Sequence, residues 1–470
     1  MNNHTNETVF NPDSFRDRIA TVDEKGDRAW IYPKKPKGPL YNKRTIVSLI
    51  MLTLLFSGPF LKINGHPLLL FNILERKFII LGVAFWPQDF YLFVLAMLTF
   101  VVFIILFTAL FGRLFCGWAC PQTIFMEMVF RKIEYFIEGD STHQKALNAA
   151  PMSPLKFWKK LSKHVLFFVL SFIIANTFLA YIIGIDEIKH IVTDDPSKHT
   201  GGLIAIMAFT GVFYGVYARF REQVCIVVCP YGRLQGVLLD KNSVVIGYDY
   251  KRGEPRGKLH KNEERILGDC IDCHQCVQVC PTGIDIRNGT QLECVNCTAC
   301  IDACNNIMDH VGKPQGLIRY TSENAIATKE KFKVTSRIIG YSIVLVILMG
   351  TLITLLAIRH DVEATILRTP GLLYQPQDGN KFSNLYNIKI VNKTFNDLPL
   401  EIRIVEPKGE IKWVGNGISE IGKQDISEGE FFIILPQEQI ITSKTKVRIE
   451  IISNGRVVET DDTNFIGPVK

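Results

Sequence analysis

Long apolar blocks alternate with polar stretches over the first 357 residues, and shorter alternating patterns follow them. A helix of about 20 apolar residues is long enough to cross the hydrocarbon core of a bilayer. The pattern therefore predicts an α-helical bundle of five transmembrane helices, at 45–61, 90–111, 165–184, 202–218 and 338–357.

The charges between these blocks predict an orientation. The N-terminal segment 1–44 carries nine Lys and Arg residues and the loop 112–164 carries eight, whereas the loop 185–201 has four acidic residues against two lysines. Lys and Arg are enriched in cytoplasmic loops of membrane proteins. We therefore expect the N-terminus and the segment 219–337 in the cytoplasm, and everything after the fifth span on the opposite side.

Beyond the fifth block, the period of the hydrophobic pattern changes to two. Apolar and polar residues alternate at 386–393, 400–405, 431–435 and 446–452, as in half-buried strands. We expect a linker at 363–377 and a small β-sandwich within 370–470. This region contains no cysteine, so it need not bind metal.

Length, charge and cysteine usage restrict the class of protein. A chain of 470 residues suggests two to four structural units. The net charge of +7 could indicate nucleic-acid binding, but the basic residues flank the apolar blocks, so we expect no nucleic-acid partner. All 12 cysteines fall in short clusters, which indicates metal binding in a reducing compartment rather than disulfides. The first 44 residues are polar and basic, and we expect no signal peptide.

Eight cysteines form two runs with C-x-x-C-x-x-C-x-x-x-C spacing, which is typical of proteins with two [4Fe–4S] clusters. In such runs the fourth cysteine binds the other cluster. We predict a cytoplasmic α+β ferredoxin-like domain at 219–337, although structural zinc also uses C-x-x-C pairs. Asn305 replaces the usual proline after the second run. One predicted ligand set is Cys270, Cys273, Cys276 and Cys304, and the other is Cys280, Cys294, Cys297 and Cys300.

The other four cysteines form two C-x-x-x-C-P pairs just past the second and fourth predicted spans: Cys116 with Cys120, and Cys225 with Cys229. On a continuing helix, this spacing would place both thiols of a pair on one face. Two such faces could converge on a soft metal site, which would favour Cu(I) over Cu(II). Buried inert thiols, zinc, a further iron–sulfur site and thiol–disulfide cycling remain alternatives.

Several cofactor motifs are absent from the sequence. No G-x-G-x-x-G follows a predicted strand, and there is neither a P-loop nor a C-x-x-C-H haem motif. The motifs therefore leave the electron donor unidentified.

Longer strings around the cysteines resemble one known family, the FixG/CcoG/RdxA proteins. The resemblance covers about residues 40–470. It is carried by G-R-L-F-C-G-W-A-C-P-Q-T at 112–123, W-P-Q-D at 86–89, C-P-Y-G-R at 229–233, P-T-G-I-D-I-R at 281–287 and G-L-I-R-Y at 316–320.

This resemblance implies a multi-pass protein of the bacterial inner membrane with cytoplasmic clusters and a periplasmic, immunoglobulin-like C-terminal domain. It also implies reduction of Cu(II) to Cu(I) in support of cbb3-type cytochrome c oxidase assembly. Copper would then meet the catalytic residues Cys116, Cys120, Cys225 and Cys229. The implied partners are copper ions, an unknown electron donor, and either the oxidase assembly machinery or a copper exporter.

Two other functions are consistent with the same residues. A quinol-oxidising electron relay would be similar to the membrane ferredoxins of nitrate reduction, in which the same C-x-x-x-C-P pairs occur. A non-catalytic scaffold for oxidase assembly would use the clusters structurally and the β-domain for binding a partner.

Overall fold

The computed structural model describes residues 21–22, 27–63, 65–73, 77–80, 82–86, 89–258, 267–329, 334–371 and 373–468. Two predictions fall partly outside these ranges. They are the cytoplasmic segment 1–44, at residues 1–20 and 23–26, and the W-P-Q-D string, at Pro87 and Gln88. The chain divides into two compact units: residues 1–70 with 97–349, and residues 71–96 with 350–470.

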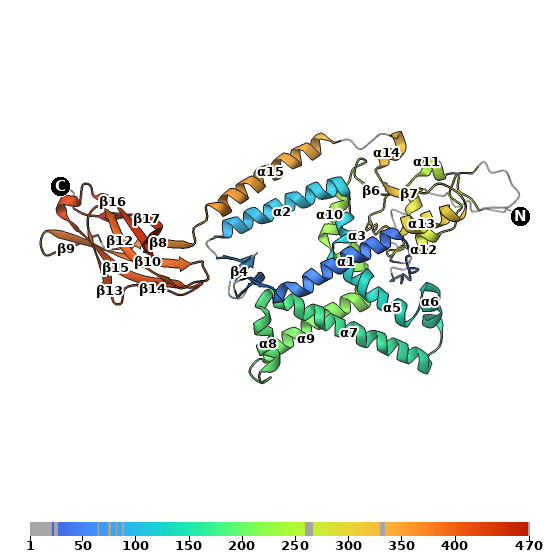
Figure 1. Cartoon of the computed structure of the whole chain (residues 1–470), viewed down its shortest axis with the longest axis horizontal. Helices are drawn as coiled ribbons and strands as arrows, with labels where there is room; N and C mark the ends of the chain where they lie inside the picture. The colour runs from blue at the N-terminus through green and yellow to red at the C-terminus, as the bar shows by residue number, and fades with distance from the viewer. Residues whose placement is uncertain are drawn as a thin grey trace, which may run out of the picture. The chain divides into compact units, whose positions relative to one another are not determined.

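Within the described residues, five helices are long and apolar enough to cross a membrane. The third is longer than the predicted span because Ser153 caps its N-terminus and Pro154 occupies its first position, so a basic turn precedes the apolar part. The helices are α1 (Pro39–Ser57), α2 (Phe90–Phe111), α7 (Pro154–Ile183), α9 (Thr200–Gly215) and α15 (Ser336–Ala357) (Figure 1).

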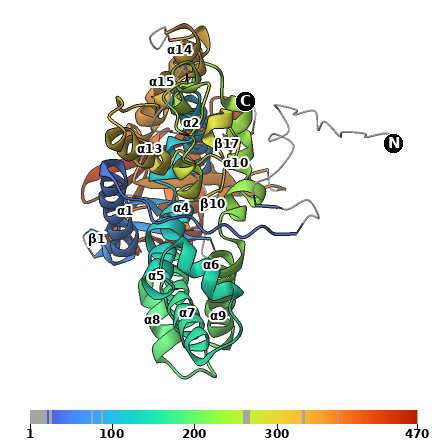
Figure 2. The same ribbon diagram turned by 90° about the vertical axis from the view of Figure 1, so that its right-hand side faces the viewer.

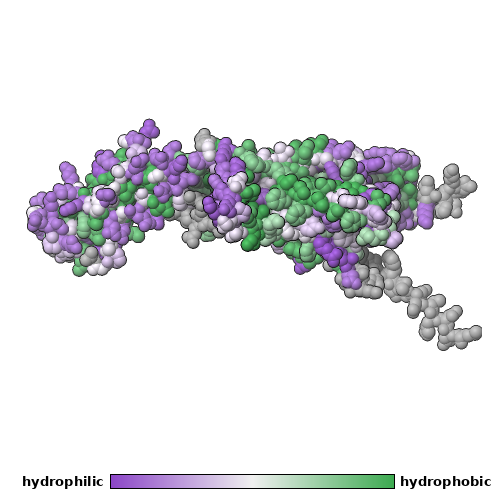
Figure 3. All heavy atoms as spheres, turned by 90° about the horizontal axis from the view of Figure 1, so that it is seen from below, coloured by the Kyte–Doolittle hydropathy of each residue, from purple (hydrophilic) through white to green (hydrophobic). Residues whose placement is uncertain are grey.

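Large apolar side chains are exposed along these helices, as the hydrophobic surface in Figure 3 shows. Leu49 on α1 is 65% exposed and Ile204 on α9 is 69% exposed. Continuous apolar surface of this extent is rare on proteins that face water only. The helices therefore present the surface expected of a membrane protein.

An aromatic core joins the helices of the first unit. α7 packs against α9 and against α5 (Arg131–Ile137), with α6 (Ser141–Ala149) close by (Figure 2). The core is connected to α5 and α9 by two π-helical segments, η3 (Phe125–Phe130) and η4 (Val216–Phe220). Its fully buried members are Phe125, Phe130, Phe167, Ile174 and Tyr217.

The two ferredoxin-type runs surround a small separate core of the same unit. An antiparallel pair of strands, β6 (Val245–Tyr248) and β7 (Ile318–Thr321), closes one side. The runs lead into α12 (Gln275–Gln278) and α13 (Ala299–His310). α13 continues past Cys304 because Asn305 leaves the helix unbroken where proline would stop it.

The second unit contains a two-sheet β-sandwich. One sheet has the order β13-β15-β10-β8, with β9 paired to β10, and the other has the order β12-β16-β17. Along β10 (Lys381–Asn392) and β16 (Lys444–Ser453), alternate residues are buried in the core between the sheets. The remaining strands are β8 (Val362–Arg368), β9 (Gln375–Gln377), β12 (Glu401–Glu406), β13 (Glu410–Val414), β15 (Ile426–Pro436) and β17 (Arg456–Ile466).

The predicted linker at 363–377 is wrong in its first part. β8 pairs with β10 from Val362↔Asn392 to Arg368↔Tyr386, and Val362, Ala364 and Ile366 are buried. The alternation of this strand was hidden by Leu367, an apolar residue that is 64% exposed. The β-sandwich therefore begins close behind the fifth candidate span.

Candidate functional site

Each ferredoxin-type run folds as the same loop. Asp272 and His274 in the first run have φ values of 54° and 56°, and Asn296 and Thr298 in the second have 52° and 65°. Non-glycine residues rarely adopt this left-handed conformation, although Asn and Asp do so more readily than most. The two runs therefore form a structural repeat, with sharp turns at equivalent positions.

The eight cysteines of the runs line two enclosed cavities in the combination that the spacing predicts. In both cavities, the fourth cysteine of one run joins three cysteines of the other, and Cys276 also borders the second cavity. The first cavity is lined by Cys270, Cys273, Cys276 and Cys304, and the second by Cys280, Cys294, Cys297 and Cys300.

The combination of cysteines in the two cavities suits a pair of clusters. Each cavity offers three thiols from one run and the fourth cysteine of the other run. A structural zinc ion needs four ligands, with sulfurs about 2.3 Å from the metal. In proteins with two [4Fe–4S] clusters, the fourth cysteine of each run binds the other cluster. The interleaved donor sets therefore fit two cubes.

Cys280 shows how the local fold prepares a ligand. Burial raises the pKa of its thiol, while the Thr282 side chain and the backbone N–H groups of Thr282, Gly283 and Ile284 act against this rise. Such donors stabilise a metal-bound thiolate and tune its properties. The turn that aims them requires Gly283, whose φ is +75°.

The two C-x-x-x-C-P pairs also share one geometry, which differs from the predicted continuing helix. Cys116 lies in α3 (Leu114–Trp118), whereas Cys120 is the extended N-cap residue of α4 (Pro121–Ile124). Cys225 and Cys229 repeat this around η5 (Val224–Val228) and α10 (Pro230–Leu238). The prediction of one helical face was wrong because proline disfavours helical backbone in the residue before it.

The four thiols nevertheless come close to one another. The Cys116 thiol lies 3.4 Å from Gln235 Oε1. Burial, with a contribution from Cys120, raises the pKa of Cys116 to about 11. Burial, with contributions from Cys120 and Cys116, raises the pKa of Cys225 to about 12. The thiols of Cys116 and Cys225 are therefore protonated at neutral pH unless a metal displaces the proton. We call Cys116, Cys120, Cys225 and Cys229 the four-cysteine site.

The four-cysteine site adjoins the second ferredoxin-type run. Cys116 packs against the small core formed by Val279, Val295, Cys297 and Ala299. A Cβ atom on Gly117 would lie 2.4 Å from the Val295 carbonyl oxygen, so only glycine permits this backbone approach. The predicted second cluster and the four-cysteine site are thus immediate neighbours.

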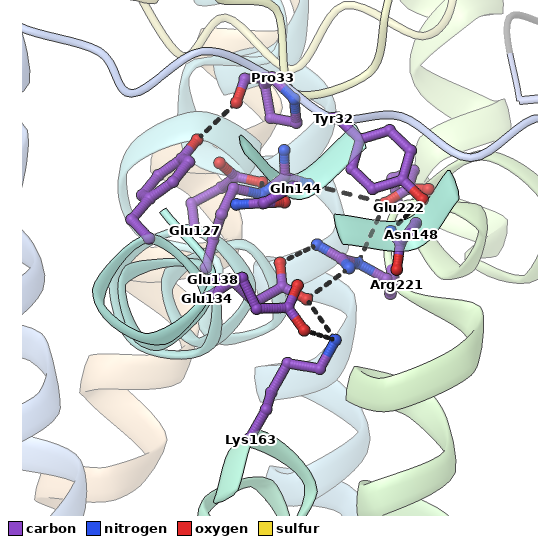
Figure 4. A network of polar contacts seen from close by, with 12 residues as sticks. Tyr32, Pro33, Glu127, Glu134, Glu138, Gln144, Asn148, Lys163, Arg221 and Glu222 are labelled. Atoms are coloured by element: carbon purple, nitrogen blue, oxygen red, sulfur yellow. Dashed lines mark hydrogen bonds and ion pairs between the residues drawn. The ribbon is translucent and has the colours of Figure 1, made fainter. Parts of the chain in front are cut away.

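A buried charge network lies near the candidate spans (Figure 4). Glu134 accepts two hydrogen bonds from Arg221, at 2.9 and 2.7 Å, and Glu138 pairs with Lys163 at 2.9 Å. Burial alone would raise the pKa of Glu134, but Arg221 and Lys163 outweigh it and hold the pKa below its ordinary value. The network therefore keeps the Glu134 carboxylate charged.

This network forms one wall of a cavity of about 520 Å³. Aromatic residues Trp30, Tyr32, Phe167 and Tyr214 form much of the rest, and Tyr214 is hydrogen-bonded to His164 at 2.9 Å. The sequence pattern did not indicate this cavity, because its residues come from four separate segments and carry no motif. The basic and aromatic residues between 28 and 44 were the only local signal.

A membrane protein with this dicluster arrangement is an iron–sulfur electron-transfer protein of oxidoreductase type. Family models support this class: a 4Fe–4S dicluster domain matches residues 220–323, and a 4Fe–4S binding domain matches residues 93–137. The model for the IG-like fold at the C-terminus of FixG matches residues 352–468. A ferredoxin-like domain and an immunoglobulin-like domain are therefore confirmed as parts of the fold, whereas their predicted boundaries and sides of the membrane stay predictions.

The chain belongs to the FixG/RdxA family. It is 32% identical to Protein RdxA of Cereibacter sphaeroides over 79% of this chain and 81% of that protein. It is 31% identical to Protein RdxB of the same organism, over 77% of this chain and 79% of that protein. The match to Nitrogen fixation protein FixG of Rhizobium meliloti is 36% identical and covers 63% of this chain and 57% of that protein.

One solved structure has a weak likeness, the crystal structure of a FixG-related protein from Vibrio parahaemolyticus. It covers 23% of this chain and 97% of its own, with 13% identity and a TM-score of 0.19. At this level the likeness supports no statement about the fold.

Proposed function

We propose that the protein is a cupric reductase that converts Cu(II) to Cu(I) at the four-cysteine site. Cys270, Cys273, Cys276 and Cys304 would hold one [4Fe–4S] cluster, and Cys280, Cys294, Cys297 and Cys300 the other. Bound clusters supply one-electron transfer, which matches the single electron that Cu(II) accepts. The observation that carries the proposal is the packing of Cys116 against Cys297 and its neighbours.

The chain's own residues favour the reduced ion. Thiolates are soft ligands that bind Cu(I) in preference to harder ions. A site that holds Cu(I) more tightly than Cu(II) raises the potential of the copper couple and makes the reduction more favourable. The protonated thiols of Cys116 and Cys225 would each release a proton when copper binds.

Anaerobic reoxidation tests this proposal. Chemically reduced full-length protein should be reoxidised by Cu(II), with loss of the reduced-cluster EPR signal and formation of Cu(I). The Cys116→Ala/Cys225→Ala double variant should react at least about tenfold more slowly. Reoxidation of the same variant by ferricyanide is the control and should be unchanged. An unaltered rate with Cu(II) would exclude the four-cysteine site as the place of reduction.

A quinol-oxidising relay is the second candidate, and the aromatic cavity favours it. Its volume is within the range typical of small-molecule sites, and its aromatic walls suit a planar ring. Phe167 lines the cavity, and its ring centroid lies 4.8 Å from that of Phe130. The Phe130 ring is in turn stacked on the Tyr217 ring, with the centroids 4.3 Å apart. Tyr217 is close enough to Cys120 and Cys225 to interact with them electrostatically.

In this candidate function, a hydroquinone loses two electrons and two protons, and His164 and Glu138 are the nearby groups that could accept the protons. A soluble quinol analogue should then reduce the clusters anaerobically without copper. His164→Leu should slow this reduction, whereas His190→Leu, on the exposed side of α8 (Ile185–Thr193), should not. Failure of the wild-type clusters to reduce would remove this candidate.

For the cellular setting, we propose the bacterial inner membrane, with the clusters in the cytoplasm and the β-sandwich in the periplasm. The charge distribution of the loops supports this orientation. We also propose, as the resemblance to the FixG/CcoG/RdxA proteins implies, a role in cbb3-type oxidase assembly, with copper passed to the assembly machinery or to an exporter.

A further inference from the structure

A large open cavity, of about 630 Å³, lies beside the predicted cluster ligand Cys280. Cys280 also lines the enclosed cavity of the second ligand set, so it borders both spaces. Trp30 and Tyr32 supply the aromatic part of the wall of the open cavity, and Lys34 and Lys145 supply positive charge. A molecule in this cavity would therefore lie within direct reach of a cluster ligand.

One wall of the open cavity is the segment 30–37, which hydrogen bonds fasten to two helices. Its Tyr32 carbonyl accepts a hydrogen bond from Ser141 Oγ on α6 at 2.6 Å (Figure 4 shows Tyr32). The backbone N–H of Lys34 donates to the carbonyl of Gln278, the last residue of α12, at 2.7 Å. The wall is thus already in place, and a partner could meet it without a large rearrangement.

Exposed lysines gather on and around this segment, and none of them forms an ion pair with a carboxylate within the described residues. Asp140 also lines the cavity, but it accepts hydrogen bonds from the backbone N–H groups of Lys35 and Ser141, at 2.8 Å each. Burial and, after it, the nearby charges of Lys35 and Arg44 hold the pKa of Lys132 below its ordinary value. Positive charge is therefore concentrated here. The exposed lysines are Lys34, Lys35, Lys37 and Lys145.

The position of Cys280 indicates which kind of anion such a surface would receive. Basic residues beside a membrane span can bind anionic lipid headgroups. A headgroup would gain nothing from contact with a cluster ligand, whereas a molecule that delivers an electron must come close to one. Positive charge around the point of entry attracts an acidic protein and orients it during the encounter. The arrangement therefore favours an acidic electron carrier over a lipid.

We propose that segment 30–37 and Lys145 on α6 form the docking surface for an acidic one-electron carrier protein of the ferredoxin type. One electron leaves the reduced carrier and enters the cluster held by Cys280, and no proton is transferred and no bond is made or broken. The same ligand set adjoins Cys116 of the four-cysteine site through Cys297. The carrier would therefore be the electron donor for the proposed copper reduction, and only this physiological role rests on the proposed function.

Stopped-flow reduction tests the docking surface without copper. The probe is reduced plant-type ferredoxin, an acidic one-electron carrier of low potential. Mixed anaerobically with oxidised full-length protein in non-ionic detergent, it should reduce the clusters. The second-order rate constant should fall at least about tenfold when salt rises from about 0.02 M to about 0.5 M.

Charge reversal gives the second measurement. The Lys34→Glu/Lys145→Glu variant should react with reduced ferredoxin at least about tenfold more slowly than wild type at low salt. Wild-type clusters that ferredoxin fails to reduce would overturn the proposal. A rate constant that neither salt nor charge reversal changes would overturn it as well.

Three controls separate charge from damage to the fold. Lys241→Glu reverses an exposed lysine that is not among the described residues lining the cavity, and it should leave the rate constant unchanged. Gln275→Ala removes the hydrogen bond donated by Lys34 Nζ at 3.2 Å without changing the charge, and it should also react normally. Reduced methyl viologen, a small cation, should reduce the double variant as fast as wild type. An equal loss of rate with viologen would assign the effect to damaged clusters and refute the docking role.

The outcomes also distinguish this surface from the proposed reductase and from lipid binding. Clusters that ferredoxin reduces but Cu(II) does not reoxidise would refute the reductase and leave the docking surface intact. Clusters that a quinol analogue reduces and ferredoxin does not would refute the docking surface alone. An effect of charge reversal that appears only in vesicles of anionic lipid, and not in detergent, would assign the lysines to the membrane and overturn the proposal.

Discussion

The carboxylate of Asp302 accepts a hydrogen bond from the backbone N–H of Tyr41 at 2.8 Å and from that of Leu40 at 3.2 Å. Asp302 lies on α13 between two predicted cluster ligands, and Tyr41 lies in the first turn of α1. The first N–H groups of a helix have no partner within it, and Gly38 at the N-cap has no side chain to supply one. A cluster-binding helix therefore caps a candidate membrane span.

We expect Asp302→Ala to destabilise the protein by about 1–2 kcal/mol, the usual cost of a lost helix cap. Thermal unfolding of the detergent-solubilised protein measures this loss. Asp309→Ala on the same helix is the control, because the Asp309 carboxylate accepts hydrogen bonds from the exposed side chain of Gln315 and caps no helix among the described residues. Equal stability of the two variants would show that the cap contributes nothing.

The close backbone approach at Gly117 gives a second prediction. Gly117→Ala should displace the loop of the second ferredoxin-type run, since the new Cβ would lie 2.4 Å from the Val295 carbonyl oxygen. We expect the EPR spectrum of one cluster to change. Gly211→Ala is the control, because a Cβ at Gly211 meets nothing within 4 Å. Identical spectra for wild type and Gly117→Ala would contradict this approach.

The Glu134–Arg221 pair provides a third prediction. Glu134→Leu alone should destabilise the protein by about 3–5 kcal/mol, because it leaves a guanidinium buried beside fewer anions. The double variant Glu134→Leu/Arg221→Leu should recover part of the loss, since an apolar pair needs no charge compensation. Unfolding measurements on both variants test this prediction. A double variant less stable than Glu134→Leu would contradict it.

The buried ion pairs of Asp89 indicate that the stability of the second unit depends on pH. Its carboxylate is bonded to Lys393 at 2.7 Å and to Arg359 at 2.8 Å. Burial alone would raise its pKa, but these two partners outweigh it and hold the pKa below the ordinary value. A lowered pKa stabilises the folded state above the ordinary pKa, and this contribution disappears as pH falls through the lowered value.

We therefore expect Asp89→Asn to reduce stability by about 3 kcal/mol at pH 7 and to weaken the loss of stability below about pH 4. Calorimetry of the full chain against pH measures both effects. Asp462→Asn, at an exposed pair with Lys446 and Arg448, is the control and should leave the melting temperature unchanged. An unaltered pH profile in Asp89→Asn would refute the assignment.

Reporter fusions test the proposed orientation. An alkaline phosphatase fused after Lys470 should be active, because the enzyme folds only outside the cytoplasm. The same reporter placed after Lys258, between the fourth and fifth candidate spans, should be inactive. Activity at Lys258 would reverse the orientation and place the clusters outside.

The spacing of residues along the sequence was sufficient to predict much of this protein's architecture. The runs of apolar residues predicted all five candidate spans, because a bilayer requires a fixed length of apolar helix whatever surrounds it. The interleaved ligand sets of the two runs were predicted from the positions of their cysteines, and the same sets line the two cavities. Period-two alternation predicted the β-sandwich but not its first strand.

Only the tertiary structure decided which distant segments meet. It broke both C-x-x-x-C-P pairs into helix–turn–helix units, placed Cys116 against the second ferredoxin-type run, and surrounded the thiols with Gln235, Thr123 and Arg113. These residues lie in segments separated by more than a hundred positions. A sequence pattern records what each residue prefers locally, whereas the partners of buried polar groups from distant segments become visible only when the chain is packed.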